Sequence, residues 1–194
     1  MAELKDSGAR REFNSGAVRD IAEGKGRCDL LPLTTVATYF RSLGAACDKE
    51  RQISYNEVAD ILTMIDMFIR EGTGSTIYQA ITKFINLRGY DSIITALLEV
   101  SKHYEDGARK YDERNWEKGI PCHCYVDSGI RHLFKWFDNW DDEPHDRAFL
   151  WNMFGLMWTV KNHPEINDLP YVLLQKEASK AEDKEWGSVE ERLK

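Results

Sequence analysis

The sequence predicts a mainly or wholly α-helical protein: a compact helical domain with an irregular, glycine-rich N-terminal arm. Apolar residues recur at helical spacing in several stretches between residues 58 and 157. No long stretch alternates apolar and polar residues as a half-buried strand would. The 194 residues are 42% hydrophobic and 30% charged, which describes one globular domain with a sizeable core.

The first 33 residues form the predicted arm, which we expect to pack on the helical core. Its end, "DLLPL", contains Pro32, which discourages a helix from running through. Its middle, "SGAVRDIAEGKGRCDL", begins at Ser15 and places Arg19, Lys25 and Arg27 among glycines. Glycines let backbone N–H groups approach a ligand, and Arg and Lys hold phosphate oxygens. Taken alone, the segment favours a surface loop whose cations pair with local acids (Asp20, Glu23 and Asp29).

Residues 34–175 are expected to form one helical domain. Apolar spacing predicts a helix over 58–69, which "EGTGS" at 71–75 interrupts. Ser75 or Thr76 is the expected N-cap of the next helix, over 77–85, and Gly89 its C-terminal glycine. A further helix runs toward Gly107, and its apolar positions are Ile93, Ile94, Leu97 and Leu98. We expect all these apolar stripes to pack in the core.

The second half of the domain begins with a polar loop at 105–125 and continues with two amphipathic helices. Their apolar positions lie at 126–137 and 149–157. The charged tail, residues 176–194, is expected to be a solvated helix or a mobile end.

The polar loop supplies a second basic cluster in "GARKYDERNWEKG", residues 107–119. Cations alternate there with polar and aromatic side chains: Lys110, Tyr111, Arg114, Asn115, Trp116 and Lys118. Such mixing suits a phosphorylated aromatic ligand, although local ion pairs with Asp112, Glu113 and Glu117 explain the cations equally well. Arg131 and His132 follow on the next helix, where His132 shares a face with Lys135 or serves as a core histidine.

Metal and nucleophile motifs are weak in this sequence. "CHC" at 122–124 lacks the second half of a zinc site. His145-Asp146 is an HD dipeptide that His103, His123 or His132 could complete, but a two-residue match has little weight. An ExxE pattern occurs only at 182–185, with no ExxD after it, and the other candidate carboxylates match no spacing (Glu99, Asp127, Asp142 and Glu143). The sequence therefore predicts no resident metal or cofactor, and Mg²⁺ only if the protein is an enzyme.

Charge and hydropathy limit the possible partners. The net charge of −7 argues against general nucleic-acid binding, while a local basic pocket for a small anion stays compatible with it. No apolar run approaches the roughly 20 residues of a membrane span. Four irregularly spaced cysteines (Cys28, Cys47, Cys122 and Cys124) suit a reducing cytoplasm. Amphipathic, aromatic-rich helices favour a homo-oligomer.

Four segments together resemble a bacteriophage family, the N-terminal domain of dATP/dGTP diphosphohydrolases. They are "SGAVRD…EGKGRCDLLPL", "HYEDGARKYDERNWEKGI", "DSGIRHLFKW" and "HDRAFLWNM". The resemblance covers 12–33 and about 97–158, so residues 34–96 look like an insertion. It implies purine deoxynucleotide recognition and makes these positions candidate contacts: Ser15, Arg19, Lys25, Arg27, Lys110, Tyr111, Arg114, Asn115, Trp116, Lys118, Arg131 and His132. The arm would fold back and close a phosphate pocket with the 110–118 loop and the Arg131/His132 helix.

Two functions follow from this resemblance, and a third does not need it. The favoured one is a nucleotide sponge in the cytoplasm of an infected bacterium, which sequesters a defence signal such as a cyclic dinucleotide or an ADP-ribose-type molecule. The alternative is a Mg²⁺-dependent dATP/dGTP diphosphohydrolase, with Mg²⁺ held by some of Glu99, Asp127, Asp142 and Glu143. A regulatory or structural role would reduce the basic clusters to ordinary ion pairs.

Overall fold

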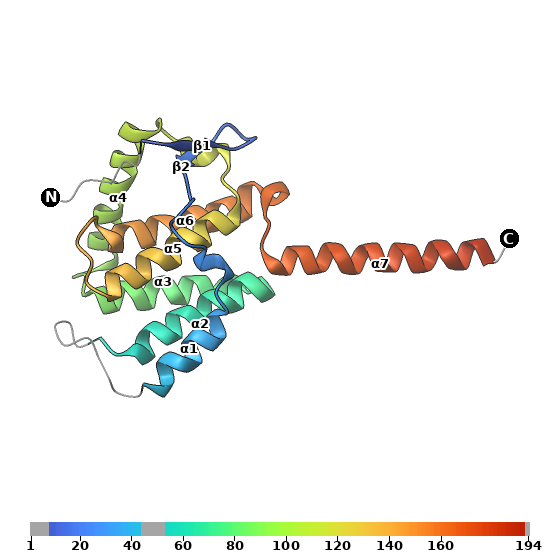
Figure 1. The fold of residues 1–194 in the computed structure, drawn as a ribbon, viewed down its shortest axis with the longest axis horizontal. Helices are drawn as coiled ribbons and strands as arrows, with labels where there is room; N and C mark the ends of the chain where they lie inside the picture. The colour runs from blue at the N-terminus through green and yellow to red at the C-terminus, as the bar shows by residue number, and fades with distance from the viewer. Residues whose placement is uncertain (1–7, 44–52, 193–194) are drawn as a thin grey trace.

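A computed structural model describes residues 8–43 and 53–192, with side chains to residue 181. The described part is mainly helical, as predicted, and its only sheet is a two-stranded hairpin in the arm (Figure 1). The α-helices are α1 (Leu33–Ser42), α2 (Tyr55–Glu71), α3 (Gly74–Arg88), α4 (Ile93–Lys110), α5 (Cys122–Phe137), α6 (His145–Asn162) and α7 (Pro170–Arg192). The strands are β1 (Arg10–Glu12) and β2 (Val18–Asp20), and the 3₁₀ turns are η1 (Cys28–Leu30), η2 (Asn115–Lys118) and η3 (Pro164–Ile166).

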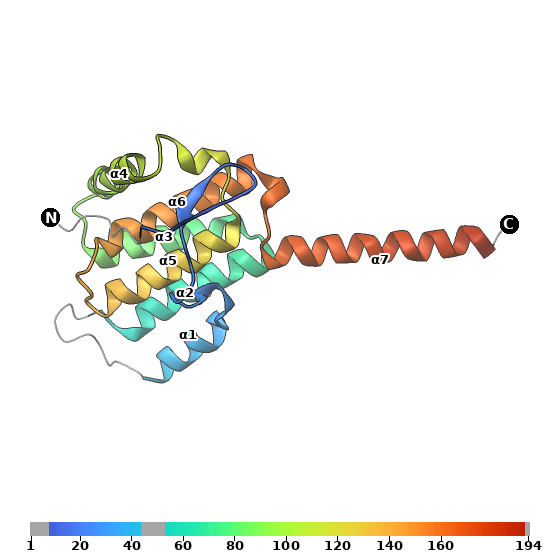
Figure 2. The same ribbon diagram turned by 45° about the horizontal axis from the view of Figure 1, so that its top comes forward.

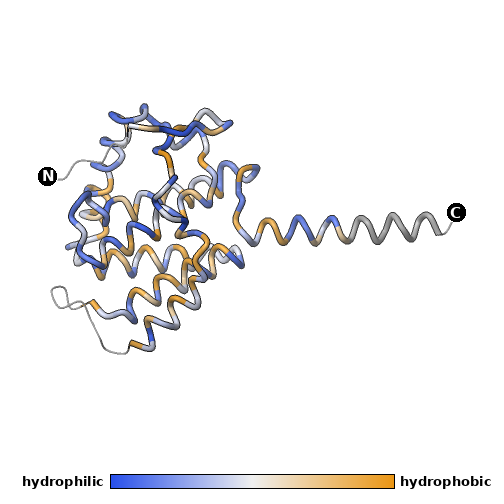
Figure 3. The backbone as a smooth tube through the Cα atoms, in the orientation of Figure 1, coloured by the Kyte–Doolittle hydropathy of each residue, from blue (hydrophilic) through white to orange (hydrophobic). Residues whose placement is uncertain are grey.

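The helices stack in layers around a common core. Helices α1, α2 and α3 form one side, α5 and α6 lie above them, and α4 and the hairpin cover the opposite side (Figures 1 and 2). Hydrophobic residues recur along α2 and α3, whereas hydrophilic ones dominate the hairpin side (Figure 3). Phe84 of α3 joins the layers, with its ring centroid 4.7 Å from Trp136 of α5 and 4.4 Å from Phe149 of α6.

Two glycines let α5 and α6 pack closely. A Cβ added at Gly155 would lie 2.4 Å from the Tyr125 ring, and one at Gly129 would lie 2.5 Å from the Met153 methyl. Real side chains do not approach so closely, so a larger residue at Gly155 would displace the Tyr125 ring, and one at Gly129 would displace the flexible end of Met153. The close contact fixes the relative placement of the two helices that carry most of the candidate site.

The arm lies against the helical body through its second strand. Asn115 of η2 accepts a hydrogen bond from the Val18 N–H (2.9 Å) and donates one to the Val18 carbonyl (2.8 Å). Its side chain thereby satisfies the outer backbone groups of β2 as a third strand would. Ala17 is fully buried, and the Ser15 hydroxyl donates to the Gly119 carbonyl. The three hydrogen bonds hold the hairpin to the segment between α4 and α5.

Several local predictions need correction. Thr73, not Ser75 or Thr76, is the N-cap residue of α3, and the Thr76 hydroxyl instead donates to the Thr73 carbonyl (2.7 Å). Gly89 does end α3 in the left-handed conformation, as predicted. The expected loop at 105–125 is shorter, because α4 continues to Lys110 and α5 begins at Cys122.

Helix α4 turns a different face to the core than its sequence suggests. The four apolar residues that were expected to pack inside are 43–65% exposed (Ile93, Ile94, Leu97 and Leu98). Ala96, Val100 and His103 are buried instead. The prediction that these four residues form a core stripe is therefore wrong, because α4 packs on the core through Ala96, Val100 and His103 instead.

Helix α7 forms the tail and projects from the body (Figure 1). Tyr171 near its start packs on the core, and residues 173–181 are exposed. The expected ExxE pattern at 182–185 lies outside the described side chains. Among the described residues, no helix has the combined length and apolar character of a membrane span.

Candidate functional site

A layer of polar side chains lies between the arm, α4, α5 and α6. We call it the polar layer and define it by these residues: Arg19, Asp20, Lys25, His103, Lys110, Arg131, His132, Glu143 and His145. Their charges influence one another. His103, Arg19 and Arg131 each lower the pKa of His132. Lys110 lowers the pKa of Lys25, and Glu143 raises it. Arg19 and His145 thus both lie near His132, although most of the chain separates the two.

Asp20 collects the cations on the arm side of the layer. Lys110 donates to its carboxylate at 2.8 Å, the Tyr111 hydroxyl donates at 2.8 Å, and the Lys25 ammonium lies at 3.9 Å. Burial lowers the pKa of Lys25, Asp20 partly offsets this, and Arg131 and Lys110 lower it further. Positive charge is therefore crowded around Lys25, whose nearest carboxylate also accepts from Lys110.

Arg131 ties the glycine-rich turn of the arm to α5. Its guanidinium donates to the Lys25 carbonyl (3.1 Å), the Gly26 carbonyl (3.0 Å) and the Asp127 carboxylate. Gly26 has a φ of 78°, a conformation that glycine adopts without strain. Asp127 also accepts from the Cys28 N–H at 2.7 Å, so this buried carboxylate anchors the arm.

Two buried nitrogen atoms of the layer have no hydrogen-bond partner among the described residues. Arg19 lies 5.4 Å from both the Tyr125 and Trp151 rings and donates to Asn152 (3.1 Å), but its Nη1 is unpaired. His103 is 7% exposed and its Nδ1 is also unpaired. Burial, followed by the nearby charges of Arg147 and Arg19, lowers the pKa of His103 to about 4. The interior of the layer thus contains a neutral imidazole and an unsatisfied guanidinium donor.

The start of α6 brings a histidine pair and a glutamate together. His132 Nδ1 lies 3.0 Å from His145 Nδ1, and Glu143 Oε1 lies 3.5 Å from the first and 3.7 Å from the second. Burial, followed by the His145 charge, lowers the pKa of His132 well below its usual value. Burial also raises the pKa of Glu143, against the opposing effect of His145.

A carboxylate and a lysine support this group from behind. Asp142 lies 2.8 Å from His145 Nε2, and Lys135 donates to the same carboxylate at 3.0 Å. His132 and Lys135 share a face of α5, as expected from their spacing, and both contact the 142–145 segment.

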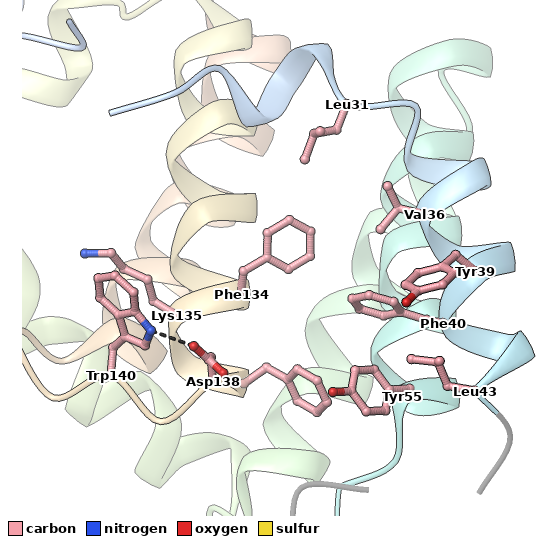
Figure 4. A pocket seen from close by; sticks show the side chains of 11 residues that line it. Leu31, Val36, Tyr39, Phe40, Leu43, Tyr55, Phe134, Lys135, Asp138 and Trp140 are labelled. Atoms are coloured by element: carbon pink, nitrogen blue, oxygen red, sulfur yellow. Dashed lines mark hydrogen bonds between the residues drawn. The ribbon is translucent and has the colours of Figure 1, made fainter. Parts of the chain in front are cut away.

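Two cavities border the site. One of about 470 Å³ lies beside the histidine pair and is lined by Arg88, Glu143, His145 and Asp146 among others. A second, of about 520 Å³, is apolar and lies between α1 and α5, with Tyr39, Phe40, Tyr55 and Phe134 in its wall (Figure 4). Phe134 is two positions from His132 and so points away from the polar layer.

The structure separates the predicted contact residues into two groups. Those in or beside the polar layer are Arg19, Lys25, Lys110, Tyr111, Arg131 and His132. The others lie elsewhere: Arg27 pairs with Asp29, Arg114 with Glu117, and Lys118 with Asp112 (3.4 Å). These three cations make the local ion pairs that the sequence left open. Trp116 packs in an aromatic cluster, 4.9 Å from Trp158, while Ser15 and Asn115 hold the arm.

The four candidate carboxylates do not form one site. Glu99 pairs with Lys102 and Arg147, and Asp127 pairs with Arg131. Only Asp142 and Glu143 share a neighbour, His145. An all-oxygen Mg²⁺ site built from this set therefore does not fit the structure.

The HD dipeptide is also only partly supported. His132 does meet His145, whereas His123 pairs with Asp168. Asp146 does not join them, since its carboxylate accepts from Arg88 (2.6 Å) and Tyr90 (3.0 Å). Sequence reasoning named Asp20 only as a local partner of the arm cations, and it did not assign Glu143 to the histidines. The i, i+3 spacing of Asp142 and His145 was the sequence feature that could have indicated their contact.

Fold and site together define a helical domain in which an N-terminal arm and three helices enclose a cation-rich polar layer. In the comparison with known families, residues 83–169 match the family described as dATP/dGTP diphosphohydrolase, N-terminal. This confirms the family resemblance for that part of the chain. The match contains α4, α5 and α6, begins inside the segment expected to be an insertion, and leaves out the arm. No curated protein and no solved structure matches the chain.

Proposed function

We propose that the polar layer binds the phosphates of a purine deoxynucleotide. The observation that carries the proposal is the crowding of positive charge around Lys25, to which the arm, α4 and α5 each contribute. Phosphate oxygens pair favourably with such a group of ammonium and guanidinium donors. The family description names dATP and dGTP, which supports a purine deoxynucleotide as the ligand class.

The donors of the layer are only partly used by the protein itself. Lys25 is 3.9 Å from its nearest carboxylate, and Arg19 Nη1 has no partner among the described residues. An anion that reaches both groups would satisfy a buried donor and relieve the repulsion between cations. Arg27 and Arg114 offer less, because each already pairs with an acid within three residues.

Hydrolysis of the bound nucleotide is the second candidate function. The family description favours a diphosphohydrolase. In that reaction water attacks the α-phosphorus and the α–β anhydride bond breaks, so the products are a deoxynucleoside monophosphate and pyrophosphate. Sequestration without hydrolysis, as in a sponge, uses the same binding step. The dispersed positions of Glu99 and Asp127 support it, since they leave Mg²⁺ without its expected ligands.

The binding site is tested with single charge-removing variants. We expect Lys25→Gln to weaken dATP or dGTP binding by about tenfold or more, since a hydrogen bond to a charged group contributes about 1.5–3 kcal/mol. Arg114→Gln is the matched control and should bind as the wild type does. Isothermal titration calorimetry measures both affinities. Equal weakening in the two variants, or an effect of Arg114→Gln alone, would contradict this site.

The fate of the ligand is a separate measurement. The protein is incubated with dATP, dGTP or a cyclic dinucleotide, with divalent cations or with EDTA, and then denatured. Chromatography of the released material identifies it. Monophosphate and pyrophosphate that form only with cations support the diphosphohydrolase. Intact ligand in near-stoichiometric yield with divalent cations as well as in EDTA supports sequestration.

A further inference from the structure

The histidine pair and Glu143 have the geometry of three ligands around one cation. The three facing atoms are His132 Nδ1, His145 Nδ1 and Glu143 Oε1, and their separations are 3.0, 3.5 and 3.7 Å. Ligand atoms about 2.0–2.1 Å from a tetrahedral Zn²⁺ lie about 3.3–3.4 Å from one another. All three separations are within about 0.4 Å of that value, so one ion fits between the atoms with little movement.

The surroundings of His145 prepare it as a ligand. Asp142 lies 2.8 Å from Nε2, which places the ring proton there and directs the Nδ1 lone pair toward His132 and Glu143. Metal-bound histidines commonly donate their second N–H to a carboxylate in this way, which fixes the ring and raises its basicity. Lys135 in turn holds Asp142 at 3.0 Å. Both supporting contacts, Asp142 to His145 and Lys135 to Asp142, are present in the structure.

The alternative without a metal leaves a charge poorly compensated. A hydrogen bond from His132 to His145 explains their 3.0 Å contact. It does not explain Glu143, whose side chain is 14% exposed and whose nearest cationic partner in the described structure is an imidazole nitrogen 3.5 Å away. The His145 side chain is 1% exposed and the His132 side chain 15% exposed. Two imidazole nitrogens and a mostly buried carboxylate oxygen that converge in this way offer a cation three ligand atoms.

We infer that His132, Glu143 and His145 bind one divalent transition-metal ion of the Zn²⁺ or Mn²⁺ class. Two imidazole nitrogens and one carboxylate favour such ions over Mg²⁺, which prefers oxygen ligands and retains its water. Glu143 and His145 also line the cavity of about 470 Å³, which leaves room for water or an exogenous ligand at the remaining positions. The site shares only Glu143 with the Mg²⁺ ligands considered from the sequence and takes a different ion, and it does not depend on nucleotide binding.

The test is direct metal binding by the full chain. Protein stripped with EDTA and dialysed is titrated with Zn²⁺, Mn²⁺ and Mg²⁺ in a calorimeter, and bound metal is counted by mass spectrometry. We expect one Zn²⁺ per chain and at least 100-fold weaker Mg²⁺ binding. Glu143→Gln and His132→Gln should each lose at least tenfold in Zn²⁺ affinity. His163→Gln, which removes a histidine paired with Glu165, is the control and should keep the site.

Two further measurements keep the outcome decisive. Circular dichroism identifies a variant that fails to fold; if His132→Gln does so, the near-isosteric Glu143→Gln variant decides the outcome. Co²⁺ substitution reports the ligands: nitrogen and oxygen ligands give d–d bands without an intense thiolate charge-transfer band. A thiolate band that Cys124→Ser removes would place the ion at the 122–124 segment and overturn the inference. Equal Zn²⁺ binding in all variants, or none in the wild type, would also overturn it.

Discussion

At the scale of single residues, burial decides the charge state of the polar layer. His103 keeps a neutral ring because its environment excludes water and places Arg147 and Arg19 nearby. Burial raises the pKa of Glu143, the opposite direction to His103, since desolvation disfavours the charged form of either group. Cations, neutral imidazoles and a carboxylate therefore occupy one small region near neutral pH.

The depressed pKa of His103 predicts a loss of stability in mild acid. The unfolded chain binds a proton below pH 6.5, whereas folded His103 does so only near its pKa of about 4. Stability therefore falls as the pH decreases through that window. Between pH 7.5 and 5 this group removes about 2 kcal/mol from the free energy of unfolding.

His103→Leu removes this titration and also the unpaired Nδ1. Urea unfolding in EDTA at pH 7.5 and 5 should show a smaller loss for the variant, by about 2 kcal/mol. His132 titrates in the same direction in both proteins and cancels in the difference. An equal loss in wild type and variant would mean that His103 is protonated or exposed in the folded protein.

At the scale of elements, helical periodicity located the helices but not their orientation. The stripe at 58–69 is buried in α2 as predicted, because α2 packs between other apolar faces. The stripe of α4 is exposed, because α4 packs through Ala96, Val100 and His103, and the placement of the helix against α6 depends on distant segments. The hairpin was also missed: strands of three residues are too short to show alternation.

Two glycines in helices provide a matched test of the packing. Gly155→Ala should destabilise the protein by about 2 kcal/mol or more, because the new methyl group would overlap the Tyr125 ring. Gly107→Ala in α4 meets nothing within 4 Å, and should stabilise the protein by about 0.5–1 kcal/mol through helix propensity. Chemical denaturation measures both free energies. Destabilisation of the two variants by similar amounts would contradict the close α5–α6 contact.

At the scale of the whole molecule, the candidate site combines what the sequence indicated with what only the fold provides. Arg19, Lys25 and Arg131 could be suggested from glycine-rich basic segments. Arg27 and Arg114 could not be separated from them, because pairing with an acid two or three residues away depends on the local backbone. The association of Glu143 with two histidines follows from the packing of α5 against the start of α6, which no spacing in the sequence encodes.

The exposed apolar stripe of α4 gives the predicted homo-oligomer a specific test. Ile93, Ile94, Leu97 and Leu98 are exposed on one side of the helix, since 3.6 residues per turn place them within an arc of about 140°. Adjacent exposed leucines and isoleucines are typical of a protein–protein contact. We expect this face to be covered when two copies of the chain associate, which would remove apolar surface from water.

The Leu97→Glu/Leu98→Glu double variant should therefore be monomeric, because two buried carboxylates would lack partners in the contact. Size-exclusion chromatography with light scattering measures the mass of wild type, double variant and Thr82→Glu, a control at an exposed position on α3. The wild type and the control should have a multiple of the chain mass. A wild type with the mass of a single chain would contradict the predicted homo-oligomer. An oligomeric double variant would instead place the contact on another face, because charge on α4 would then be tolerated.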